Sequence, residues 1–330
     1  MEYVILTLAL AGIVLGADTL VSGAVSVAKR FGMSDFLIGA LIVGVGTSLP
    51  ELTVSFSSAM HGNPDVAIGN VVGSNIFNIL GILGLTALFF PVAVSRNNVR
   101  FEIPFCIFVS VLSWMLTSNF FNGSPAFISR VDGVVLLLCF AFFMWYSLRR
   151  DMRPVAENAA NSVANSEANP AANSTANPAA KSDAAPLWIA FLKVAAGLAV
   201  LIISCELFVD KTIVIAKAWG MSEAVIAITL IACGTSLPEL AASIAAALRK
   251  NTQLALGNVI GSNIFNLTLI LGLSSQAGGL TSSGITDIDF AVMTAAAMLP
   301  LFFGIRGRIG RAGGTVMLLA FVVYNIYLIQ

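Results

Sequence analysis

Charged residues are scarce in this sequence. Only 10% of the 330 residues are Asp, Glu, Lys or Arg, while 58% are hydrophobic. Soluble domains have about 25% charged and 45–50% apolar residues, so the composition excludes an ordinary water-soluble domain and indicates a membrane protein. The net charge is zero and no basic cluster is interleaved with aromatic residues, which excludes a nucleic-acid partner.

Cysteine and histidine are also rare. The four cysteines stand singly in apolar segments, without the CxxC spacing of zinc or redox sites. His61, the single histidine, lies at the edge of a loop, where we expect it to be solvated. The N-terminus lacks the basic start of a cleaved signal peptide, so its apolar segment is expected to stay in the mature protein. We expect no bound cofactor.

Long hydrophobic runs, by contrast, are abundant. A transmembrane helix needs about 20 mostly apolar residues, and this criterion predicts an all-α membrane protein with ten transmembrane helices. The predicted spans are 3–28, 36–60, 67–91, 101–121, 128–148, 187–216, 224–248, 254–277, 286–305 and 312–329.

The segment 151–186 between the fifth and sixth spans has no apolar run. It is rich in Ala, Asn, Ser and Pro, a composition that cannot bury a core and predicts a disordered linker. Its central part holds three acidic residues, Glu157, Glu167 and Asp183, so it is not expected to form a calcium-sensing domain.

Two motifs show that the chain is an internal duplication. "GTSLPEL" occurs at 46–52 and again at 234–240, and "GNVVGSNIFN" at 69–78 matches "GNVIGSNIFN" at 257–266. Both pairs share one offset of 188 residues, and the matches include polar residues that chance similarity between apolar helices would not reproduce. The sequence therefore predicts a first repeat at 1–150 and a second at 187–330. With five spans each, the second repeat is inverted in the membrane, a common transporter plan.

The basic residues predict the orientation of the chain in the membrane, because Lys and Arg collect in cytoplasmic loops. Three basic residues fall on one side, Arg130, Lys211 and Lys217, and most of the others on the opposite side. The sequence therefore predicts a multi-pass protein of the inner (plasma) membrane, with both termini outside and the linker in the cytoplasm.

Each copy of "GTSLPEL" places a glutamate inside an apolar span. Glu51 is the only charged residue between Asp35 and His61, and Glu239 is its repeat mate. A charge in mid-bilayer costs about 2.5–3.5 kcal/mol and marks a functional site by default. The alternative is a carboxylate that serves helix packing or stays protonated.

The neighbours of Glu51 favour a cation site. On a helix, the hydroxyls of Thr47 and Ser48 share a face with the Glu51 carboxylate, and Pro50 frees a backbone carbonyl in the preceding turn. Carboxylate, hydroxyl and carbonyl oxygens are the ligands that hard cations such as Ca²⁺ prefer. The second half repeats this set with Thr235, Ser236, Pro238 and Glu239.

The second motif is expected to form the opposite wall of a hydrophilic cage. Asn70, Ser74 and Asn78 recur every four residues and make one polar stripe. An amide also supplies a carbonyl oxygen that can hold Na⁺. Alternatively, these side chains hold membrane helices together by hydrogen bonds. Their repeat mates are Asn258, Ser262 and Asn266.

The doubled "GTSLPE" and "GNVVGSNIFN" motifs resemble those of the Na⁺/Ca²⁺ exchanger branch of the cation/Ca²⁺ antiporter superfamily, in particular its compact prokaryotic members. The resemblance covers nearly the whole chain except the linker. It implies that the first and sixth helices slide past the others. In one departure, some members have Asp where this chain has Asn266, so two carboxylates are expected here. The ion ligands that it implies are the carboxylates of Glu51 and Glu239, the hydroxyls of Ser48, Ser236, Ser74 and Ser262, and the carbonyls of Gly44, Thr47, Ala232 and Thr235.

The function predicted is secondary antiport of Ca²⁺ against Na⁺ by alternating access, with both ions as substrates, the lipid bilayer as surroundings and no obligate protein partner. A H⁺/Ca²⁺ antiporter is the main alternative, since a buried glutamate takes up a proton readily; a passive channel is another. An enzyme is not expected, because no His or Lys accompanies the duplicated Ser and Glu as a general base. Asp18, Glu206 and Asp210 fit either an access path for cations or interhelical ion pairs.

Overall fold

The computed structural model describes residues 2–118, 126–168, 186–218, 234–282 and 284–329. The described chain is helical apart from four very short strands. The elements of the first half are α1 (Glu2–Phe31), α2 (Asp35–Ile38), the π-helical turn η1 (Gly39–Gly44), α3 (Val45–Thr47), α4 (Leu49–Met60), α5 (Pro64–Ile76), the π-helical turn η2 (Phe77–Leu83), α6 (Gly84–Phe89), β1 (Val92–Ala93), the π-helical turn η3 (Asn98–Glu102), α7 (Ile103–Thr117), β2 (Ala126–Ile128) and α8 (Arg130–Ala168).

The described elements of the second half follow a similar order. Its elements are α9 (Leu187–Ala218), α12 (Leu237–Leu248), α13 (Thr252–Phe265), the π-helical turn η7 (Asn266–Ile270), α14 (Leu271–Gln276), β3 (Leu280–Ser282), α15 (Asp287–Gly304), β4 (Arg308–Ile309) and α16 (Arg311–Ile329). Helices α4 and α12 match residue for residue at the offset of 188. The strands join the halves, because β1 pairs with β4 and β2 with β3, all antiparallel.

Eight helices of the described chain are long and apolar enough to cross a membrane, and the bent pair Asp35–Thr47 and Leu49–Met60 brings the number to nine. The first part of the predicted span 224–248 lies outside the described residues, and its second part is α12. Helix α8 continues to Ala168, although the apolar part that can span ends at Asp151. The linker limits of 151 and 186 remain a prediction.

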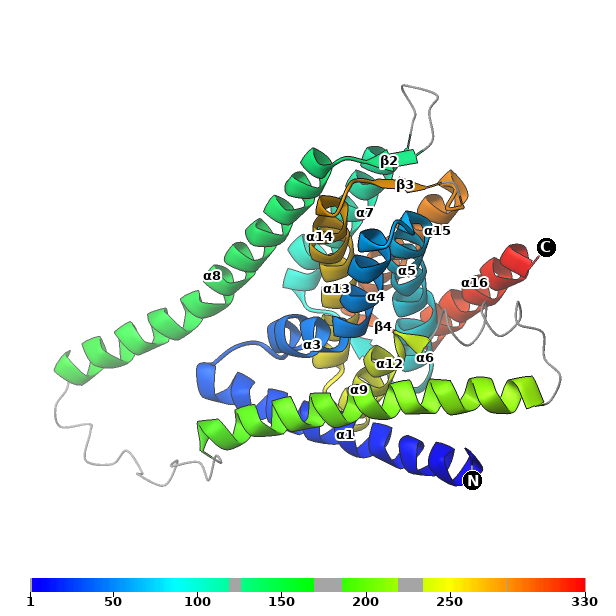
Figure 1. The fold of residues 1–330 in the computed structure, drawn as a ribbon. Helices are drawn as coiled ribbons and strands as arrows, with labels where there is room; N and C mark the ends of the chain where they lie inside the picture. Colours follow the sequence, from blue (N-terminus) through cyan, green and yellow to red (C-terminus); the bar gives the residue numbers. More distant parts are fainter. Residues whose placement is uncertain (1, 119–125, 169–185, 219–233, 283, 330) are drawn as a thin grey trace.

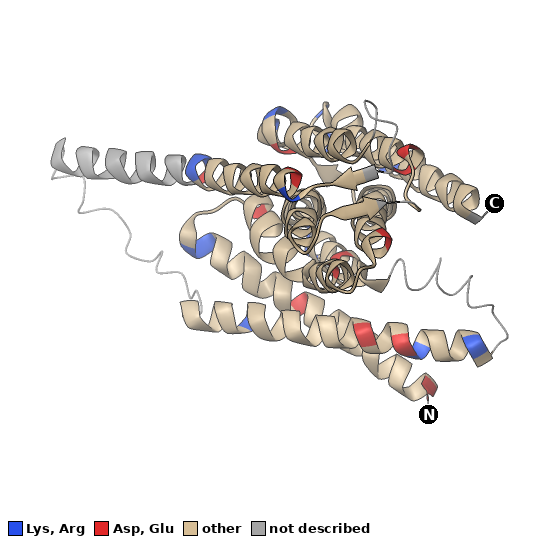
Figure 2. Cartoon of the chain, turned by 45° about the horizontal axis from the view of Figure 1, so that its top comes forward, with Lys and Arg blue, Asp and Glu red and all other residues tan. Residues whose placement is uncertain are grey.

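The helices form a buried centre and a lipid-facing periphery. In the stretch Thr252–Gln276, 94% of the apolar window is buried, and in Pro64–Phe89 78%, but only 17% in α9 and 28% in α1. Large exposed side chains such as Leu8, Leu15 and Ile203 cover the outer helices. Most of each span is uncharged (Figure 2), although α1 and α9 carry the acids Asp18, Glu206 and Asp210 within their length. The chain is therefore an all-helical membrane protein, and the two copies of the "GNV(V/I)GSNIFN" motif lie in its two most buried stretches.

Helices α1 and α9 pack along each other and run across the end of the central bundle (Figure 1). Glycines make this contact close. A Cβ added at Gly16 would lie 2.7 Å from the Leu201 nitrogen, and one at Gly197 would lie 2.4 Å from the Leu20 nitrogen. The ammonium of Lys211 also forms an ion pair with Glu2 at 2.9 Å. The two helices thus form one tightly joined unit.

Candidate cation-binding site

Each "GTSLPEL" segment breaks its helix at the serine. Ser48 (φ −85°, ψ 10°) separates α3 from α4, and the chain bends by 47° there. Ser236 has nearly the same backbone conformation before α12. Proline follows at the second helical position, where its missing N–H has no helical partner to lose. Both breaks place the glutamate in the first turn of a new helix, deep inside the protein.

The two glutamates are bound crosswise between the halves. The Ser48 hydroxyl donates to Glu239 Oε1 at 2.8 Å, and the Ser236 hydroxyl donates to Glu51 Oε1 at 2.8 Å. All four side chains are fully buried. The sequence placed each hydroxyl beside the glutamate of its own helix. The structure corrects this arrangement, because the bend at the serine directs the hydroxyl to the opposite repeat.

An asparagine braces each glutamate-bearing helix. Asn70 Nδ2 donates to the Glu51 carbonyl at 3.2 Å and to Ser55 Oγ at 2.9 Å. Asn258 Nδ2 makes the same two bonds, to the Glu239 carbonyl at 3.1 Å and to Ser243 Oγ at 2.9 Å. These two asparagines therefore have the helix-holding role that the sequence left open.

The threonines of the motif complete the crosswise pattern. Thr47 Oγ1 donates to Asn258 Oδ1, and Thr235 Oγ1 donates to Asn70 Oδ1, each at 3.3 Å. Thr47 is fully buried, whereas Thr235 is partly exposed. The threonine hydroxyls therefore fasten each bend to the bracing asparagine of the other half.

Three further predicted ligands lie at π-helical turns, while Ser74 lies in α5 and Ser262 in α13. Gly44 ends η1, Asn78 lies in η2, and Asn266 begins η7. Such turns are frequent at functional sites because they depart from the regular helical hydrogen-bond ladder. The Ser262 hydroxyl donates to the Gly44 carbonyl at 3.3 Å, and Ser74 Oγ lies 3.0 Å from Ser236 Oγ.

Several buried oxygens of this cage have no hydrogen-bond partner. They are the second carboxylate oxygens (Oε2) of Glu51 and Glu239 and the side-chain amide oxygens (Oδ1) of Asn78 and Asn266. Buried polar atoms are nearly always satisfied, and leaving one unpaired costs about 1–3 kcal/mol. Unpaired oxygens facing a shared buried site are the donor set of a hard cation. The residues present therefore fit Na⁺ or Ca²⁺ as a transported ion.

The described residues contain no group of three or more His, Cys, Asp or Glu that could hold a metal ion. Glu51 and Glu239 are the two buried carboxylates of the cage, and its other unpartnered oxygens are neutral.

The structure brings most predicted site residues into one cage. Ala232 is the exception, since it lies outside the described residues. Sequence reasoning left Asn75 and Asn263 off the ligand list, yet both border the cage: Asn78 Nδ2 donates to Asn263 Oδ1 at 3.0 Å, and Asn263 Nδ2 donates to the Asn75 carbonyl at 3.2 Å. Their signal was available, because both belong to the duplicated "GSNIFN" motif.

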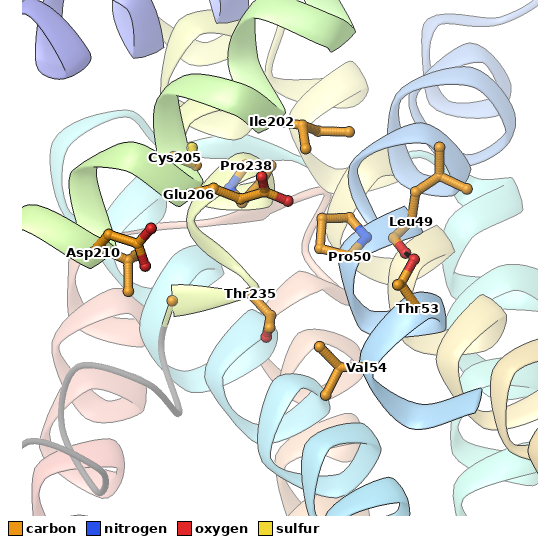
Figure 3. A pocket seen from close by; sticks show the side chains of 12 residues that line it. Leu49, Pro50, Thr53, Val54, Ile202, Cys205, Glu206, Asp210, Thr235 and Pro238 are labelled. Carbon is orange, nitrogen blue, oxygen red and sulfur yellow. Dashed lines mark hydrogen bonds between the residues drawn. The ribbon is translucent and has the colours of Figure 1, made fainter. Parts of the chain in front are cut away.

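The three other acids that the sequence left open, Asp18, Glu206 and Asp210, divide into two kinds. Asp18 accepts from Arg249 at 2.6–2.7 Å, so it forms an interhelical ion pair. Its repeat mate Glu206 lines a cavity of about 300 Å³ between α9 and α4, together with Asp210. Figure 3 shows both carboxylates on α9 facing Pro50 and Thr53 across this cavity.

The geometry defines the class first: a duplicated helical membrane protein with two buried carboxylates that are hydrogen-bonded across the interface of its repeats. The chain belongs to the sodium/calcium exchanger protein family, whose model matches residues 1–149 and 189–330. It is therefore a cation antiporter of that family and not an enzyme.

Known proteins resemble the chain along nearly its whole length. It is 34% identical to the sodium/calcium exchanger MaX1 of Methanosarcina acetivorans, covering 99% of this chain and 98% of that protein. It is 32% identical to the inner membrane protein YrbG of Escherichia coli, covering 94% and 92%. Among solved structures, the sodium-calcium exchanger NCX_Mj superposes with a TM-score of 0.81 at 30% identity, covering 99% of this chain and 98% of that chain. These matches confirm the family and the fold that the two motifs predicted.

Proposed function

We propose that this protein exchanges Ca²⁺ for Na⁺ by alternating access, with Glu51 and Glu239 as the central cation ligands. The observation that carries the proposal is the pair of unpartnered, fully buried carboxylate oxygens, one from each repeat, in a cage of neutral oxygens. A buried charge without a partner is strongly destabilising. A bound cation supplies that partner.

The neutral ligands follow from the same geometry. Ser48, Ser236, Ser74 and Ser262 provide hydroxyl oxygens, and the Gly44 carbonyl lies 3.3 Å from the Ser262 hydroxyl. Asn78 and Asn266 provide amide oxygens that have no other partner. Thr47, Thr235 and Ala232 complete the proposed ligand set through their backbone carbonyls.

Charge balance favours exchange over uniport. Two carboxylates neutralise one Ca²⁺ or two Na⁺, so either load leaves the site neutral and able to move within a low-dielectric environment. A third Na⁺ would travel uncompensated and make the cycle sensitive to membrane voltage. Competition of the two ions for one set of oxygens couples their movements in opposite directions.

A proton-coupled exchanger uses the same glutamates as proton carriers. Asn78 and Asn266 argue against it, because an amide does not titrate near neutral pH. These two positions can hold Na⁺ but cannot carry protons, so only the two glutamates remain as possible proton carriers.

The deciding experiment is ⁴⁵Ca²⁺ uptake by purified protein in proteoliposomes loaded with Na⁺. We expect an outward Na⁺ gradient to drive uptake, and K⁺ or pH gradients of equal size to fail. Uptake driven equally well by protons would replace the proposal with H⁺/Ca²⁺ antiport. Uptake without any counter-ion would indicate a channel.

The proposed orientation puts both termini outside and the 151–186 linker in the cytoplasm. It is supported by the basic residues, of which Arg96, Arg100, Arg306 and Arg308 fall on the linker side. Single cysteines in 155–185 should react with an impermeant thiol reagent only from the cytoplasmic side, and those at 61–65 only from outside. The reverse pattern would overturn the orientation without affecting the exchange proposal.

A further inference from the structure

The inverted repeat creates two equivalent grooves. One lies between α9 and α4 and holds the cavity of about 300 Å³ lined by Glu206. The other lies between α1 and α12 and holds a cavity of about 430 Å³ lined by Asp18. At the offset of 188 residues, α1 corresponds to α9, α12 to α4 and Asp18 to Glu206. The two grooves have the same origin, so their differences come from the residues at which the repeats differ and from the conformational state.

The grooves differ in one ion pair. Across the α1–α12 groove, the guanidinium of Arg249, at the C-terminal end of α12, donates to Asp18 Oδ1 through Nε at 2.7 Å, and its Nη2 lies 2.6 Å from the same oxygen in an ion pair. The repeat mate of Arg249 is His61, at the C-terminal end of α4. His61 Nδ1 instead lies 2.7 Å from the carbonyl of Ser57 on its own helix. No ion pair joins His61 to Glu206 in the described part of the chain.

The two grooves are mechanically linked. Helices α1 and α9 approach so closely at Gly16 and Gly197 that added methyl groups would meet backbone atoms at 2.4–3.0 Å, and the Lys211–Glu2 ion pair ties them together. A shift of this unit relative to the central helices therefore changes both grooves at once. In inverted-repeat transporters, the opposite access state arises when the two repeats exchange their arrangements.

We propose that the Asp18–Arg249 ion pair locks the state seen in this structure, and that Glu206 and His61 form the corresponding lock of the opposite state. This inference rests on the alternating access of the proposed function. When the α1–α9 unit shifts, Asp18 leaves Arg249 while Glu206 approaches His61. The locks are unequal, because a guanidinium binds a carboxylate through two N–H groups and an imidazole through one.

The difference in strength between the two locks affects which state of the transport cycle is more populated. Each lock must break before the ion can be released on its side, so the stronger Asp18–Arg249 pair favours the present state when no ion gradient acts. A residue pair remote from the cage thereby sets the resting distribution of the two states.

The test uses two matched reporter cysteines in the full chain, after replacement of the four natural cysteines. Thr53→Cys reports the α9–α4 groove, and its repeat mate Ala241→Cys reports the α1–α12 groove. Thr53 is exposed in this state and Ala241 only partly. The rate of reaction with a soluble maleimide is measured on purified protein, without ions and without transport.

We expect Asp18→Asn and Arg249→Gln each to lower the labelling rate of Thr53→Cys and raise that of Ala241→Cys, by about two- to fivefold, the range of a solvated ion pair. The double exchange Asp18→Arg with Arg249→Asp should restore both rates. Lys250→Asn is the matched control, since it removes the adjacent positive charge at a position with φ 62° that Asn tolerates. Unchanged rates, or a change at Ala241→Cys alone, would overturn the proposed lock.

The opposite lock is tested separately. His61→Arg should lower the labelling rate of Thr53→Cys about twofold, because it strengthens the pairing with Glu206, and Glu206→Gln should cancel this effect. An effect of His61→Arg that persists beside Glu206→Gln would overturn the pairing. Because labelling needs no ion movement, these outcomes are independent of whether Na⁺ or H⁺ drives Ca²⁺ transport.

Discussion

The two halves of the cage have nearly the same sequence but unequal bonding. The serine–glutamate and threonine–asparagine bonds form equal crosswise pairs. Asn78 and Asn266 differ: Asn78 Nδ2 donates to Asn263, whereas neither side-chain atom of Asn266 has a partner. The symmetric part thus holds the carboxylates in place. In the asymmetric part both amide oxygens lack a partner, but only the Asn78 amide is fixed by a hydrogen bond from its nitrogen.

The largest expected effect comes from replacing either glutamate of the symmetric serine–glutamate pairs. We expect Glu51→Gln and Glu239→Gln each to reduce Ca²⁺ uptake in proteoliposomes at least about 100-fold, because one carboxylate leaves Ca²⁺ half neutralised in a low-dielectric site. Asp35→Asn, an exposed carboxylate outside the cage, is the control. Appreciable uptake by either glutamine variant would end the assignment of both glutamates as direct ligands.

The crosswise serines should show a smaller, equal effect. Ser48→Ala removes the hydrogen bond to Glu239, and Ser236→Ala removes the one to Glu51. A hydrogen bond to a charged group contributes about 1.5–3 kcal/mol, so the apparent Ca²⁺ affinity should fall roughly 10- to 100-fold in both. Concentration dependence of uptake measures it. Strongly unequal losses would mean that the two carboxylates do not share the ion evenly.

Substitutions of Asn78 and Asn266 should have different effects, because the two side chains are bonded differently. Asn266→Asp adds a titratable ligand, so uptake should resemble wild type at low pH, where the new carboxyl is protonated, and diverge as pH rises. Asn78→Asp should instead lower thermal stability, since it places an oxygen against Asn263 Oδ1 in place of the donating amide. Uptake between pH 5 and 9 and melting of the purified variants distinguish the two. The same pH dependence and the same loss of thermal stability in both variants would contradict the different bonding of Asn78 and Asn266.

The smallest effect concerns the tether between the halves. Replacement of residues 155–185 by a Gly/Ser tether of about 12 residues, which spans roughly 20 Å as a random coil, should leave uptake within about twofold of wild type. The halves already join through β1–β4, β2–β3 and the cage. A correctly inserted variant that loses transport would give the linker a role of its own.

Much of the fold was accessible from the sequence. The offset of 188 residues identified the duplication, the apolar runs located the spans, and the two motifs predicted the family that the comparisons confirm. Glu51 and Glu239 stood out because no other charge interrupts their apolar surroundings. The extension of α8 to Ala168 was not foreseen, because the Ala- and Asn-rich stretch carries no helical periodicity of apolar residues.

The sequence by itself determined which residues the cage contains, since residue type and duplication are local properties of the chain. Only the tertiary structure decided which residues meet. Ser48 binds Glu239 rather than its neighbour Glu51, and Asp18 is paired with Arg249 while its repeat mate Glu206 faces a cavity. These partners are 191 and 231 residues apart along the chain. Periodicity within a helix cannot specify such contacts, because they arise from the bend at each serine and from the packing of one repeat against the other.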